Sequence, residues 1–127
     1  MEGSRIALVL LGCVAASFFA MGAAALRRPD QVVRLFGTPE LTKDGRNEVR
    51  AVYGGYGLAM ALVLLATLWF PTLRLGVLLT VSMALLGMAV GRLVSAIVDG
   101  SPSRIPWFFF FVETFLASLL LFVLDNF

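Results

Sequence analysis

The sequence predicts an all-α, polytopic membrane protein, a four-helix up-down transmembrane bundle. Of its 127 residues, 60% are hydrophobic and only 14% are charged, whereas about a quarter of a typical soluble domain is charged. The mean hydropathy is +0.94. Four stretches are also long enough to cross a bilayer as helices, which takes about 20 apolar residues.

The four predicted spans cover residues 6–26, 48–70, 72–98 and 106–124. Each is expected to be helical because lipid offers no hydrogen-bond partner to a free backbone amide. The links at residues 71–72 and 99–105 are short, so consecutive spans must run antiparallel. We therefore expect residues 1–127 to form a single transmembrane domain.

The first span also resembles a cleavable secretory signal. Arg5 precedes an apolar core, and a run of small residues follows at positions 23–25. The run Leu10-Leu11-Gly12-Cys13 also resembles a lipoprotein cleavage box. Since the apolar stretch is of full length and three further spans follow, we expect a retained helix, with Cys13 as a small packing residue.

The connection formed by residues 27–47 carries five basic and three acidic residues. Pro29 could begin a short helix that ends near Gly37 and lies along the membrane surface. Its apolar face would consist of Val32, Val33, Leu35 and Phe36. The alternative is a solvated loop.

The basic residues predict the orientation. The side reached after the first span carries Arg27, Arg28, Arg34, Lys43, Arg46 and Arg104, whereas the opposite side carries Arg5 and Arg74. The positive-inside rule therefore places loops 27–47 and 99–105 in the cytoplasm and both termini outside.

Several classes of function are disfavoured. The chain has no histidine and one cysteine, which excludes disulfides, histidine proton shuttles and Cys/His metal clusters. We expect no metal and no cofactor. The net charge of +2 and the absence of a basic run with base-reading residues argue against nucleic acid. The expected partners are membrane lipids and an amphiphilic small molecule. Association into a homo-oligomer is a further alternative.

Three charges interrupt apolar stretches at or inside the predicted spans and need an explanation: Arg50, Arg92 and Glu113. An ionisable side chain at membrane depth is costly and usually faces a partner or a water-filled cavity. With a rise of 1.5 Å per residue from the loop side, Arg92 lies about 9 Å deep and Glu113 about 10 Å deep. The two are thus level and opposite in sign, while Arg50 lies near the surface.

The predicted site combines these charges with their neighbours. Three- and four-residue spacing places Asn47, Arg50, Gly54, Gly57 and Ala61 on one helix face. Glycines such as Gly54, Gly87 and Gly91 would permit close helix approach. The predicted ligand-binding residues are Asn47, Arg50, Tyr53, Gly54, Arg92 and Glu113, with Met88, Phe109 and Phe110 as walls.

Two arginines facing one glutamate favour the binding of an anionic or carbonyl-bearing amphiphile, such as a lipid or a quinone, in the loop-side leaflet. One alternative is a membrane-embedded isomerase or oxidoreductase with Glu113 as its acid/base, the candidate catalytic residue. A proton-coupled exporter is another. The last alternative is a structural subunit of a larger complex, in which the Arg92–Glu113 pair only sets the register of the two helices.

A family resemblance covers nearly the whole chain. The run Arg46-Asn47-Glu48-Val49-Arg50-Ala51-Val52-Tyr53-Gly54-Gly55 resembles the family called domain of unknown function 4345, small bacterial membrane proteins of four predicted helices. Residues 35–37, 91–92 and Glu113 extend the likeness. The resemblance implies the four-helix fold and emphasises Asn47, Arg50, Tyr53, Gly54, Arg92 and Glu113, but it implies no activity.

Overall fold

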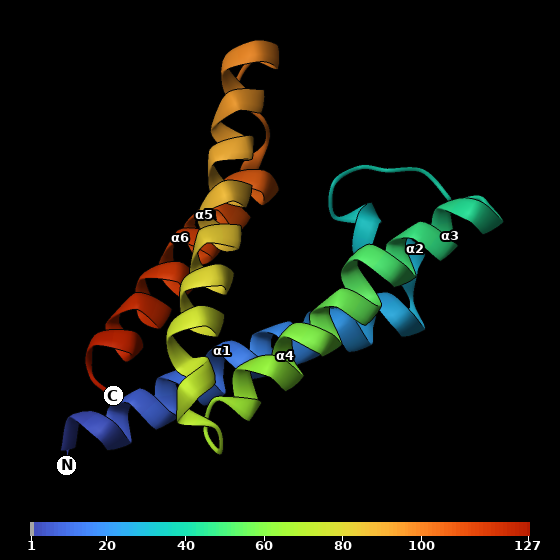
Figure 1. Ribbon diagram of the computed structural model, residues 1–127. Coiled ribbons are helices and arrows are strands. Elements are labelled where there is room, and N and C mark those ends of the chain that lie inside the picture. The colour runs from blue at the N-terminus through green and yellow to red at the C-terminus, as the bar shows by residue number, and fades with distance from the viewer. Residues whose placement is uncertain (1) are drawn as a thin grey trace.

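The computed structural model describes residues 2–127, which are helical and contain no strand (Figure 1). In chain order the elements are α1 (Glu2–Arg27), α2 (Pro29–Arg34), α3 (Lys43–Val49), the π-helix η1 (Arg50–Gly55), α4 (Tyr56–Ala66), the 3₁₀ turn η2 (Pro71–Leu73), α5 (Arg74–Asp99) and α6 (Arg104–Asp125). Four helical segments are long and apolar enough to cross a membrane: Glu2–Arg27, Lys43–Ala66, Pro71–Asp99 and Arg104–Asp125. The predicted all-α class is confirmed, and so is the presence of four helices long and apolar enough to cross a membrane.

The second span is shifted toward the N-terminus relative to its predicted bounds of 48–70. It begins at Lys43 because the side chain of Thr42 caps the helix, its Oγ1 accepting a hydrogen bond from the Gly45 amide at 3.0 Å. It ends at Ala66, where Thr67 begins the turn that leads to η2. Hydropathy alone did not reveal either end. The N-terminal cap is polar, so the helix begins before the apolar stretch does, and the final turn is apolar, so the apolar stretch continues past the end of the helix.

The spans form two helical hairpins. In the first, α1 packs against η1 and α4, and in the second α5 packs against α6. The hairpins meet through α1 with α6 and α4 with α5. Figure 1 shows them crossing near the two termini and diverging toward α3 and the α5–α6 link. One half of the molecule is thus a four-helix core, and in the other half the long helices of the two hairpins diverge.

The core lies in the half near the termini. On α1, buried residues such as Ala7, Leu11 and Val14 recur at steps of three and four, as expected for one packed helix face. They meet Leu64 of α4 and residues of α5 and α6, among them Leu78, Leu85, Ala117 and Leu120. Large apolar side chains remain exposed on the outer faces of the helices, as a lipid-facing surface requires.

Glycines bring α1 and α4 into backbone contact. A Cβ on Gly22 would lie 2.8 Å from the Gly54 carbonyl oxygen, and one on Gly57 would lie 2.9 Å from the Phe18 carbonyl oxygen. Small residues allow this approach, which is typical of membrane helix pairs. A Cβ on Gly87 or Gly91 of α5 would meet no neighbouring element within 4 Å, so the close approach expected there is absent from residues 2–127.

The π-helix changes the face that the second span presents. The buried residues of the second span are five positions apart from Val49 to Gly54. They then continue through Gly57 and Ala61 at α-helical spacing. A regular α-helix would have placed Arg50 on this buried stripe. Because a π-helix closes its turn with an i to i+5 bond, Arg50 is rotated off the stripe and is exposed.

Of the two alternatives for residues 27–47, a short helix after Pro29 is present: α2 ends at Arg34, three residues before Gly37. The chain then turns at Gly37, whose φ is +76°, a conformation that glycine adopts without strain. The Asp30 carboxylate accepts a hydrogen bond from the Leu41 amide at 2.8 Å, and Arg46 donates to the Leu41 carbonyl at 2.8 Å. These bonds fix the base of the loop between α2 and α3.

Candidate functional site

The strongest polar interaction inside the spans joins Arg92 of α5 to Glu113 of α6. Arg92 Nε donates to both carboxylate oxygens, at 3.1 and 2.9 Å, and Nη2 donates to Oε1 at 2.7 Å. The side chain of Glu113 is 4% exposed and that of Arg92 is 25% exposed. A fork of this kind is a strong, geometrically specific ion pair. The predicted level pair is therefore present.

Helix periodicity positions both charges. The buried face of α5 runs through Leu85 and Ala89, and Arg92 follows three residues later. The buried face of α6 runs from Glu113 to Ala117 and onward at steps of three and four. The pair thus continues the inner faces of α5 and α6 beyond the apolar core, into the half where the hairpins diverge.

One edge of the Arg92 guanidinium is not used by the protein. The group carries five N–H donors, and Glu113 engages only the edge formed by Nε and Nη2. No acceptor within residues 2–127 is hydrogen-bonded to Nη1. Glu113 therefore holds the guanidinium in place and leaves its far end available to another acceptor.

Two aromatic rings flank the same guanidinium. The Arg92 Cζ atom lies 5.9 Å from the ring centroid of Phe36 and 5.6 Å from that of Phe109, within the range of cation–π attraction. The two rings lie 5.4 Å apart. Phe36 belongs to the turn after α2, so this contact links the first hairpin's loop to the second hairpin.

Sequence reasoning missed Phe36 as a site residue. It lies on the apolar side of a predicted surface helix, and nothing in its spacing distinguishes it from a lipid-facing residue. Its role depends on the turn at Gly37, which is tertiary information. The only signal in the sequence is the Leu35-Phe36-Gly37 motif that carries part of the family resemblance.

Arg50 is not hydrogen-bonded to Glu113. Its Nε donates to the Leu26 carbonyl at 3.0 Å, near the C-terminus of α1, where unsatisfied carbonyls and the negative end of the helix dipole attract cations. Arg74 binds the Thr67 carbonyl at the end of α4 in the same way, at 3.0 Å. Arg50 therefore has a local structural role as a helix cap.

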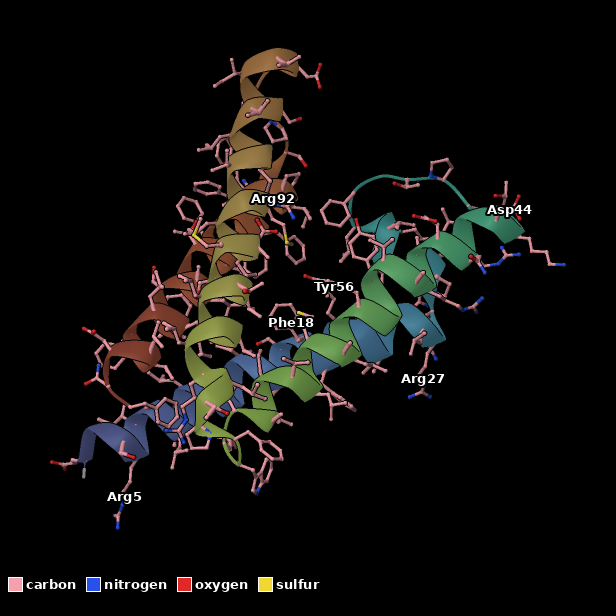
Figure 2. All side chains as sticks on the ribbon, in the orientation of Figure 1. Arg5, Phe18, Arg27, Asp44, Tyr56 and Arg92 are labelled. Atoms are coloured by element: carbon pink, nitrogen blue, oxygen red, sulfur yellow. The ribbon has the colours of Figure 1, made fainter. Side chains whose placement is uncertain are left out.

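The remaining predicted residues are divided between the hairpins. Gly54 is a packing residue, because a Cβ there would lie 2.8 Å from the Leu26 side chain. Asn47 is exposed on α3. Tyr53 is 42% exposed. Figure 2 shows Arg92 on α5 and Tyr56 on α4 on the two sides of the angle between the hairpins.

The Arg92–Glu113 pair is reached from outside through Arg92, whose side chain is 25% exposed. Two cavities, of about 420 and 350 Å³, lie elsewhere: the first between α1 and α2, the second between α4 and α5. None of the six predicted binding residues lines either one. Whatever contacts Arg92 from outside would approach from the side where the hairpins diverge.

Some hydroxyls in the spans are satisfied locally, whereas the buried hydroxyl of Ser82 in α5 has no hydrogen-bond partner within residues 2–127. The hydroxyls of Thr67, Thr114 and Ser118 bond to carbonyls of their own helices, a common arrangement in membrane helices. Within residues 2–127, no group of three or more His, Cys, Asp or Glu side chains could hold a metal ion.

A family model described as "Domain of unknown function (DUF4345)" matches residues 6–124. The chain belongs to this family. The match runs from α1 to the end of α6 and includes Arg92, Glu113 and the whole 46–55 run, so the resemblance predicted from that run is confirmed. Comparisons with curated proteins and with solved structures find no match. DUF4345 membership carries no assigned activity, and the function must be argued from the site.

Proposed function

We propose that this DUF4345 protein binds a small amphiphile, such as a lipid or a quinone, through the unused edge of the Arg92 guanidinium. The ligand would carry an anionic or carbonyl head group and would lie in the loop-side leaflet. The observation that supports the proposal is the guanidinium itself, fixed on one edge by Glu113 and without a protein acceptor on the other.

An N–H group that faces hydrocarbon without an acceptor costs several kcal/mol, on the order of 2–7. Arg92 is partly exposed in a helix that can cross a membrane, so its free donors require an oxygen from outside the protein. Carboxylate, phosphate and carbonyl oxygens match a planar fork of donors best.

The surroundings supply the apolar part of such a site. Phe36 and Phe109 flank the guanidinium, and Met88, one turn earlier on α5, is 44% exposed. A hydrocarbon tail would lie along these side chains while the head bonds to Arg92. Tyr53 would donate a hydrogen bond from the opposite hairpin.

Binding is better supported than acid/base catalysis. Both carboxylate oxygens of Glu113 accept hydrogen bonds from Arg92, so proton transfer by Glu113 would require this pair to open. The same requirement applies to proton-coupled export. A purely structural pair accounts for the Glu113 side of the contact but leaves the free donors of Arg92 without a role.

Trp107 offers a direct test. The chain has two tryptophans, and in Trp69→Phe protein Trp107, in the first turn of α6, becomes the only one. We expect a brominated fatty acid, added to the protein in detergent, to quench Trp107 fluorescence saturably. An excess of the unbrominated acid should reverse the quenching.

The test variant is Arg92→Met/Glu113→Leu in the Trp69→Phe background, and Arg74→Met at the opposite end of α5 is the matched control. The proposal predicts that saturable quenching disappears in the double variant and survives in the control. Quenching that persists unchanged in a folded double variant would refute the proposed site.

We also propose the location argued from the sequence: a multi-pass protein of the bacterial inner membrane with loops 27–47 and 99–105 in the cytoplasm. Four helices that can span a membrane support the multi-pass part. The excess of basic residues in the two loops supports the orientation.

A further inference from the structure

A second, separate feature concerns the junction of α1 and α2. A cavity of about 420 Å³ lies between the last turns of α1 and the short helix α2. Its polar side is formed by Arg27, Arg28 and Gln31, and its apolar wall includes Ala24, Val32 and Leu35. The volume falls within the range of about 300–1,000 Å³ that is usual for small-molecule sites.

The two arginines of this cavity are not neutralised by the protein. Within residues 2–127, neither Arg27 nor Arg28 has an acidic group within 4.0 Å. Asp30 is the acidic residue nearest in sequence, but its carboxylate faces the other way, bonded to the Leu41 amide and 4.0 Å from Arg46. The cavity therefore presents two uncompensated positive charges beside an apolar wall.

The place of the cavity in the fold selects the ligand. Arg27 is the last residue of a helix long enough to cross the bilayer, so both guanidinium groups lie where that helix reaches the head-group layer. A basic pocket at this level, next to apolar helix surface, suits a phosphodiester whose acyl chains continue into the leaflet.

We propose that the α1–α2 cavity binds the phosphate of an anionic phospholipid. Arg27 and Arg28 would contact the phosphate oxygens, Gln31 would bond to the head group, and an acyl chain would lie against Ala24, Val32 and Leu35. None of these residues lines the Arg92 site, and Figure 2 shows Arg27 well away from Arg92. The inference therefore stands independently of the proposed amphiphile at Arg92.

The test measures lipid retention by the full chain. The protein is equilibrated in mixed micelles of phosphatidylglycerol and phosphatidylcholine, and bound lipids are counted by native mass spectrometry. We expect the wild type to retain phosphatidylglycerol preferentially. Arg27→Gln/Arg28→Gln should reduce this preference roughly 30-fold, because each interfacial arginine contributes about 1 kcal/mol, or fivefold.

A matched variant removes the same charge from the same side of the membrane. Arg34→Gln/Arg104→Gln lies outside the cavity and should retain most of the preference. Ala24→Phe fills the apolar wall without a change of charge and should also abolish retention. An equal loss in both double variants would show general surface attraction and would overturn the proposal.

Two further outcomes decide the source of the phosphate and the independence of the site. Displacement of the lipid by millimolar inorganic phosphate would assign the cavity to a soluble anion and overturn the lipid proposal. Arg92→Met/Glu113→Leu, which leaves no unpaired buried charge, should leave the phosphatidylglycerol preference unchanged, whereas its loss in that folded variant would show that the α1–α2 cavity is not the binding site.

Discussion

Removing one partner of the Arg92–Glu113 ion pair should cost more stability than replacing both partners with apolar residues. A buried charge that loses its partner keeps its desolvation penalty, whereas a well-packed apolar pair carries none. The exposure of Arg92 on one edge moderates this cost, because the guanidinium can turn outward. We therefore expect the pair to position the guanidinium and to contribute little to the free energy of unfolding.

Single and double substitutions separate these two roles. Glu113→Leu alone should lower the free energy of unfolding by about 3 kcal/mol, since it leaves the Arg92 charge unpaired. Arg92→Met/Glu113→Leu should lie within about 1 kcal/mol of the wild type. Unfolding in mixed micelles, followed by far-UV circular dichroism, measures both. A double variant as unstable as the single one would mean that the ion pair itself stabilises the hairpin.

At the scale of helices, the first hairpin depends on glycine contacts and the second does not. Gly57→Ala would place a methyl group 2.9 Å from the Phe18 carbonyl oxygen and 3.0 Å from the Gly22 amide nitrogen. Neither atom can move without displacing a helix. Gly87 has open space around it, so it provides a matched control on α5.

Gly57→Ala should destabilise the protein by about 1–3 kcal/mol, as overpacking does elsewhere. Gly87→Ala should be neutral or stabilising by up to about 1 kcal/mol, because alanine is the better helix former. Thermal unfolding of both variants in the same detergent makes the comparison. If Gly87→Ala were the more damaging substitution, the packing of the two hairpins would be misassigned.

The helices could be predicted from the sequence because apolar length is a local property. The level pair could be predicted too, since counting along two regular helices from a short loop requires no tertiary information. Arg50 was grouped with Gly54 and Gly57 only by assuming α-helical spacing, and the π-helix η1 breaks that assumption. Phe36 was missed because its contact with Phe109 crosses from one hairpin to the other.

For the molecule as a whole, both proposed ligand sites lie in the half where the hairpins diverge. The half near the termini holds the apolar core, while Arg92, Glu113 and the Arg27–Arg28 cavity lie toward the opposite end. Both proposed ligand sites would then face the same leaflet. The positive-inside rule assigns this leaflet to the cytoplasm.

Cysteine labelling tests that orientation. In a Cys13→Ser background, Ser101→Cys lies in the α5–α6 link and Asn126→Cys follows α6 at the other end. With intact cells from which any outer membrane has been removed, a membrane-impermeant thiol reagent should label position 126 directly. It should label position 101 only after permeabilisation. The reverse pattern would place both proposed sites in the outer leaflet.

The central claim is that Arg92 holds an amphiphile, and native mass spectrometry of the extracted protein tests it most directly. An Arg27→Gln/Arg28→Gln background removes the second proposed site from the measurement. In that background, protein with the intact pair should retain a non-protein mass that folded Arg92→Met/Glu113→Leu protein lacks. Equal retention by both proteins, or none by either, would contradict the claim.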